Sequence, residues 1–186
     1  MMLMAEAKPF APAKLIIGII SSQDAIFAGA EEEVTAVYGP VDLRSPAFPF
    51  DQTDYYDKQM GKGLRRLFLS FSRLVPPESL SDIKVRTNVL EEETKKSLSR
   101  EFRVVNLDPG ILTASALIMA TAKDFAHRVP LGQGIYAHLE LLFSRSSVKF
   151  LPWTYPDFRQ ESYQRFFLEA RQAYLRQLKG MILGRA

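Results

Sequence analysis

The chain has 186 residues, of which 47% are hydrophobic, 24% charged and 11% aromatic, a composition typical of a globular domain with an apolar core. Its net charge of +3 comes from 24 basic and 21 acidic residues interspersed along the sequence, which argues against a dedicated nucleic-acid-binding protein. The absence of cysteine excludes disulfides, thiolate catalysis and cysteine-ligated metals, and it is compatible with the cytoplasm.

The apolar and polar stretches suggest one domain flanked by short tails. We expect a flexible tail over 1–12, a single globular domain over 13–180 and a C-terminal tail over 181–186. The apolar run "LIIGII" is far too short to cross a bilayer, so no membrane contact is expected.

The first half of the chain predicts a buried strand followed by a helix. The β-branched run over 14–20 is typical of a central strand that is covered on both faces. A three- and four-residue spacing then predicts an amphipathic helix that ends before Gly39, with an apolar stripe of Phe27, Ala30, Val34 and Val37. The segment 41–50, interrupted by prolines, favours an edge strand, and the alternation over 64–73 predicts another strand.

The second half mixes helices and strands. A helix is predicted from residue 80, with the charge run "EEETKK" at 91–96 on its solvent face. We expect a short strand over 103–108, a turn at Pro109-Gly110 and a small alanine-rich helix over 113–124.

Alternation over 135–143 predicts a strand that buries Ile135 and Leu141 and exposes His138, and a final helix is predicted over 157–179. The fold class is therefore α+β (mixed α/β): a single layer-built domain whose mostly antiparallel or mixed sheet is covered by about four helices.

Four stretches carry more polar and aromatic groups than packing requires. The first is the loop 48–66, where Asp51 and Asp54 could accept hydrogen bonds and Arg66 could meet an anion, with Tyr55 and Tyr56 beside them. The alternative is that the aspartates cap turns and the tyrosines cover the core edge. The second is "NLDPG", where Asn106 and Asp108 follow a short strand, in a position that also suits a plain turn.

The third stretch is "TAKDFAHRV" at 121–129. If it is helical, Lys123 and Arg128 could bind a phosphate or carboxylate, and His127 with Asp124 or Asp108 could form an acid–base pair. The alternative is the polar C-terminus of a helix.

The fourth stretch, "PWTYPDFR" at 152–159, places Trp153 and Tyr155 in a proline-rich corner that could stack on a ring or seal the core. A magnesium ion, if one is used, would be held by Asp51, Asp54 or Asp108, because hard cations prefer oxygen ligands.

These stretches, read as "FPFDQTDYYDKQMG", "VNLDPGILT", "TAKDFAHRVPLGQGIYA" and "PWTYPDFR", resemble the motif set of a prokaryotic family catalogued as domain of unknown function 4416. The resemblance covers nearly the whole chain and implies a stand-alone cytoplasmic domain, without an activity to carry over. The sequence has no G-x-x-x-x-G-K-[ST] loop, no G-x-S-x-G elbow and no H-E-x-x-H helix.

The favoured hypothesis is a domain that binds an anionic, phosphate-bearing small ligand such as a nucleotide, with acid–base or Mg²⁺-assisted chemistry if it is an enzyme. It requires the four stretches to meet at one pocket. The alternative is a non-catalytic protein-interaction module with an exposed aromatic patch. RNA binding through Lys62, Arg65, Arg66 and Arg103 ranks third, because acidic residues are interspersed with these cations.

Overall fold

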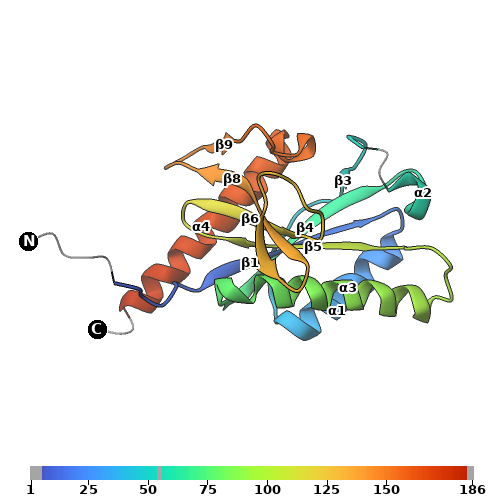
Figure 1. Cartoon of the computed structure of the whole chain (residues 1–186), viewed down its shortest axis with the longest axis horizontal. Coiled ribbons are helices and arrows are strands. Elements are labelled where there is room, and N and C mark those ends of the chain that lie inside the picture. The colour runs from blue at the N-terminus through green and yellow to red at the C-terminus, as the bar shows by residue number, and fades with distance from the viewer. Residues whose placement is uncertain (1–5, 54–55, 184–186) are drawn as a thin grey trace, which may run out of the picture.

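The computed structural model describes residues 6–53 and 56–183, and within them the chain forms a nine-stranded antiparallel sheet (Figure 1). The strands are β1 (Ala13–Ser21), β2 (Val41–Arg44), β3 (Phe48–Pro49), β4 (Arg65–Val75), β5 (Asn106–Leu112), β6 (Ala116–Thr121), β7 (Val129–Gly132), β8 (Ile135–Phe143) and β9 (Val148–Phe150). Their order is β2-β4-β1-β5-β6-β8-β7, with β3 paired to β4 and β9 paired to β8.

Helices cover both faces of this sheet. The long ones are α1 (Asp24–Tyr38), α3 (Leu80–Ser97) and α4 (Glu161–Leu183), and the short turns are α2 (Asp57–Met60), η1 (Pro77–Ser79) and η2 (Pro156–Arg159). One hydrophobic cluster joins α1 and α3 to the sheet, and a second joins α4 to it. Figure 1 accordingly shows α1 and α3 together, with α4 across the sheet from them. The predicted α+β class is confirmed.

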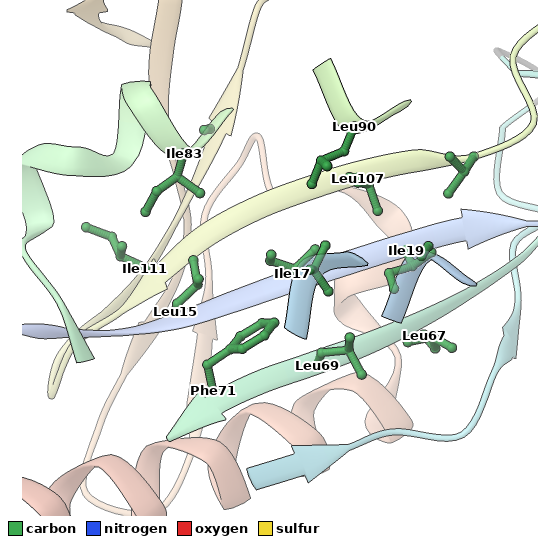
Figure 2. Packing of buried hydrophobic residues seen from close by; sticks show 14 of the residues in the cluster. Leu15, Ile17, Ile19, Leu67, Leu69, Phe71, Ile83, Leu90, Leu107 and Ile111 are labelled. Atoms are coloured by element: carbon green, nitrogen blue, oxygen red, sulfur yellow. The ribbon is translucent and has the colours of Figure 1, made fainter. Parts of the chain in front are cut away.

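The central position of β1 follows from its sequence. All nine of its residues are buried, because both faces of the strand are covered: Ala13, Leu15, Ile17 and Ile19 enter the α1/α3 cluster and Ile16 the α4 cluster. Figure 2 shows Leu15, Ile17 and Ile19 on the face covered by α1 and α3, between the apolar side chains of β4 and β5, whereas Ile16 packs on the α4 side. This confirms the predicted buried strand.

Two predicted elements in the middle of the chain are wrong. The sheet is covered by three long helices and not four, because residues 113–124 contain strand β6 in place of the alanine-rich helix. Pairing with β5 and β8 overrides the local helix preference of alanine there. The expected turn at Pro109-Gly110 is also absent, since β5 runs through both residues. At the C-terminus α4 continues to Leu183, into the segment expected to be a tail.

A bulge in β8 explains why its burial departs from the predicted alternation. Leu117 of β6 faces Leu141, but the next residue, Ile118, faces Leu139, so Glu140 is an extra residue in the ladder. The extra residue reverses which face the side chains take. Ile135 therefore enters the α1/α3 cluster and Leu141 the α4 cluster. His138, predicted to be exposed, is only 1% exposed.

Candidate functional site

The sheet opens where β5 and β6 separate. The two strands pair only between Gly110–Leu112 and Leu117–Met119. Gly110 permits this close approach, because a Cβ atom there would lie 2.5 Å from Met119 Sδ and 2.9 Å from the Ile118 carbonyl oxygen. Before Gly110 the strands diverge, and a cavity of about 560 Å³ lies along the diverging segments. We call this cavity the β5–β6 cleft.

Side chains of α3 take the place of the missing strand along β5. The Leu107 N–H donates to Glu91 Oε1 at 2.6 Å, and the Leu107 carbonyl accepts from Lys84 Nζ at 2.7 Å. The nitrogen of Pro109, two residues further on, faces the same side of the strand. Because proline has no N–H group, this position needs no hydrogen-bond acceptor. Glu91 is therefore buried, which corrects the prediction that the whole "EEETKK" run faces solvent.

A buried guanidinium joins two carboxylates at the inner wall of the cleft. Arg66 Nη2 lies 3.0 Å from Asp108 Oδ2, and Nη1 bonds to Asp157. Lys84 Nζ lies 3.7 Å from the other oxygen of Asp108. Burial alone would raise the pKa of the Asp108 carboxyl, but Lys84 and Arg66 hold it below its usual range. Burial does raise the pKa of Asp157, with Arg66 opposing the shift.

Two further cations lie near the more exposed side of the cleft. Arg103 pairs with Glu91, and its Cζ atom lies 5.9 Å from the centre of the Tyr56 ring. Lys123 Nζ lies 5.8 Å from the same ring centre. Tyr56 therefore has a cation from each of two loops beside it.

A second polar cluster adjoins the cleft wall at Tyr155, and its residue His138 also lines the cleft. His138 Nε2 lies 2.8 Å from Glu140 Oε2, and both side chains are buried. His138 Nδ1 accepts a hydrogen bond of 3.2 Å from Arg128 Nε, and Arg128 Nη2 donates to the Tyr155 hydroxyl at 2.6 Å. Burial raises the pKa of the Tyr155 phenol, while Arg128 opposes the shift. His127 stacks on Trp153 and lies 3.3 Å from His138.

All four stretches singled out in the sequence contribute to the cleft wall. The sequence-predicted residues that line it are Tyr56, Arg66, Asn106, Asp108, Lys123 and Tyr155. They come from the segment between β3 and α2, from β4, from β5, from the segment after β6 and from the loop before η2. Segments far apart in the chain thus meet at one place.

Other predicted residues lie elsewhere. Asp51 lines a separate cavity beside the cleft, and Asp124 is exposed. His127, Arg128 and Trp153 contact the His138 cluster, outside the cleft lining. Asp54 and Tyr55 fall outside the described residues.

The helical spacing assumed for 121–129 is wrong. Residues 122–128 form a loop, so Lys123 is not stacked on His127, nor Asp124 on Arg128. Arg128 Nη1 instead donates to the backbone carbonyl of Lys123 at 2.7 Å.

Two of the three candidate magnesium ligands lie apart, and the third, Asp54, falls outside the described residues. Asp51 and Asp108 line different cavities, and Arg66 and Lys84 already neutralise Asp108. Within residues 6–53 and 56–183, no three His, Asp or Glu side chains gather as metal ligands.

Sequence reasoning missed several residues of this region, namely Lys84, Glu91, His138, Glu140 and Asp157. A usable signal existed for α3, because Lys84, Thr87, Glu91 and Thr94 repeat at the spacing of its apolar stripe and are all buried. Polar residues in phase with a buried helix face indicate a polar core or site. Along β8 the bulge at Glu140 interrupts the alternation, so no regular spacing indicates that His138 and Glu140 are buried.

These features define the class of the protein: a three-layer α+β domain with a charged cleft where its sheet divides. The chain belongs to the family described as Domain of unknown function (DUF4416), whose family model matches residues 11–174. No curated protein and no solved structure matches it. Among the helices that the structure describes, none has the length and apolar character to cross a membrane.

Proposed function

We propose that the β5–β6 cleft binds an anionic small molecule, with phosphate-bearing compounds as the best candidates. The observation that carries this proposal is the charge of the wall. Four cations line the cleft, Arg66, Lys84, Arg103 and Lys123. Arg66 pairs with the carboxylates of Asp108 and Asp157, and Arg103 with Glu91, so one positive charge remains in excess. Cations that converge on a concave site from separate elements favour an anion.

The size and lining of the cleft support a compact organic ligand. A volume of about 560 Å³ is within the usual range for small-molecule sites. Phe50, Tyr56, Tyr155 and Phe158 add aromatic surface to the wall. Such a lining buries the carbon skeleton of a ligand while the polar groups fix its orientation.

If the bound compound is also transformed, the lining of the cleft favours one of the predicted proton carriers, Asp108, together with Tyr155, which was predicted only as a ligand-binding residue. Asp108 and Tyr155 line the cleft, whereas His127 and Asp124 do not. The Arg128 side chain, positioned by His138, donates to the Tyr155 hydroxyl and would stabilise its ionised form. We therefore assign any acid–base role to these two residues.

A thermal-shift screen tests the binding proposal. Purified protein is heated with nucleotides, sugar phosphates, inorganic phosphate and carboxylates. A ligand present at a hundred times its Kd should stabilise the fold by about 2.7 kcal/mol. Lys123→Gln should weaken the response, and Lys149→Gln, which alters an exposed lysine on β9 outside the cleft lining, should not. No response to any anion would contradict the proposal.

A protein partner is the second candidate function, and one surface feature favours it. Phe125, which is 63% exposed, lies 5.1 Å from His127, and His127 stacks on Trp153, which is 37% exposed. Exposed aromatic groups of this kind are enriched at protein interfaces. Trp153→Ser should abolish capture of a specific partner if this surface is used. RNA binding loses support because Arg66 is buried.

We place the protein in the cytoplasm, as its lack of cysteine suggests.

A further inference from the structure

Two buried hydrogen-bond donors on the cleft wall have no acceptor at hydrogen-bonding geometry among the described residues, although the Asn106 amide lies beside the Asp108 carboxylate and helps to lower its pKa. They are Nδ2 of Asn106, which is 2% exposed, and Nε of Arg66, which is 6% exposed. Both residues line the cleft. Buried donors are almost always paired in folded proteins, because an unmade hydrogen bond costs desolvation without return. A ligand that reaches the inner wall gains most if it brings oxygen acceptors there.

The neighbouring carboxylates limit which acceptor fits. Asn106 and Asp108 lie two apart on β5, so their side chains point to the same face of the strand. The pKa of Asp108 is held low, so this carboxylate is ionised at neutral pH and would repel an anionic oxygen. A hydroxyl group meets both neighbours well, because it can accept from Asn106 and donate to Asp108. The inner wall therefore favours hydroxyl groups over a charged group.

The more exposed side of the cleft has the opposite preference. Arg103 and Lys123 each lie within 6 Å of the centre of the Tyr56 ring, where they offer donors and positive charge. The cleft thus has a cationic side at Tyr56 and a hydroxyl-binding side at Asn106 and Asp108.

We infer that the ligand of the β5–β6 cleft is a phosphorylated sugar, whose phosphate binds beside Arg103 and Lys123 and whose hydroxyl groups bind Asn106 and Asp108. This inference rests on the proposed anion-binding function and specifies its ligand. The aromatic rings of Tyr155 and Phe158 in the same wall suit the apolar face of a sugar ring.

Calorimetric titration of the full chain separates the two parts of the inference. The probes are inorganic phosphate, ribose, ribose 5-phosphate and glucose 6-phosphate. At least one sugar phosphate should bind about tenfold or more tightly than inorganic phosphate, as expected for one or two added hydrogen bonds. Asn106→Leu should remove this advantage and leave phosphate affinity unchanged, whereas Lys123→Gln should weaken both.

A measurement on the unsubstituted protein guards against misfolding of the Asn106 variant. The assigned side-chain amide resonances of Asn106 should shift with the sugar phosphate and remain in place with inorganic phosphate.

The alternative outcomes have distinct meanings. Equal affinity for inorganic phosphate and both sugar phosphates, or an Asn106 resonance that never moves, would overturn this inference and leave the anion proposal standing. Ribose binding as tightly as ribose 5-phosphate, or no binding of any probe, would overturn both.

Discussion

Glu91 accepts a 2.6 Å hydrogen bond from the backbone N–H of Leu107, so a helix side chain does the work of a neighbouring strand. The same carboxylate pairs with Arg103 and lies 3.9 Å from Lys84. Burial raises the pKa of Glu91, although Lys84 and Arg103 act against the shift. This one residue links α3, β5 and the segment before β5, and it supports the cleft wall from behind.

Replacing Glu91 should therefore destabilise the fold strongly. Glu91→Ala leaves a buried backbone donor and two cations with fewer partners, and the free energy of unfolding should fall by about 3 kcal/mol. Urea denaturation measures the loss. Glu93→Ala is the matched control on the same helix, because Glu93 is exposed and its ion pair with Arg86 is a surface pair. Similar losses in both variants would show that Glu91 has no special structural role.

The close approach of β5 and β6 can be tested at glycine. Gly110→Ala would place a Cβ atom 2.9 Å from the Ile118 carbonyl oxygen, and the strands would have to move apart, at a cost of about 1–3 kcal/mol. Gly29→Ala in α1 meets no atom within 4 Å and should stabilise the helix by about 0.5–1 kcal/mol. Thermal unfolding should thus move in opposite directions for the two variants. A shared direction would rule out strand contact as the cause.

The lowered pKa of Asp108 predicts a pH-dependent contribution to stability. A carboxyl whose folded pKa lies below its unfolded value stabilises the fold above the unfolded value, about 3.9, and loses this effect as the pH falls through the folded value. The difference in unfolding free energy between wild type and Asp108→Asn should be the same at pH 7 and about pH 5.5, and smaller near pH 3. Urea denaturation at the three pH values provides the comparison. A difference that grows toward acid pH would mean that the folded pKa is raised.

The pKa of His127 should lie below the ordinary histidine value of about 6.5. Burial, His138 and Arg128 all lower its pKa, so the folded chain holds the proton less tightly than the unfolded chain. Protonation of the imidazole therefore lowers the stability of the fold as the pH falls through the unfolded value of about 6.5. An NMR titration of the His127 ring protons gives the midpoint directly. Arg128→Gln should raise this midpoint. A midpoint at or above 6.5 in the wild type would contradict the lowered pKa of His127.

Much of the fold could be predicted because long periodic segments carry their own signal. The apolar run of β1 and the stripe of α4, from Tyr163 to Tyr174, are buried as their spacing requires. The middle of the chain could not be predicted in the same way. Strand β6 is short and alanine-rich, and only its pairing with β5 and β8 decides its conformation.

The candidate site was harder to predict than the fold. Local composition indicated the four stretches, because loops rich in polar and aromatic groups often carry binding residues. Partners such as Lys84 and Asp157 reach the cleft from a helix and a short turn, and no local pattern predicts that they meet Arg66 and Asp108. The burial of His138 could not be predicted, because the single extra residue at Glu140 breaks the alternation from which its exposure was predicted.

The way α3 covers β5 also bears on aggregation and on what can enter the cleft. An exposed strand edge can pair with another extended chain through backbone hydrogen bonds. Here the Leu107 donor and acceptor are both occupied by side chains, and Pro109 has no donor to offer. This part of the edge is therefore closed to strand addition, and a peptide could not extend the sheet at Leu107. A ligand in the β5–β6 cleft is therefore recognised by the side chains of the wall and not by the backbone of Leu107.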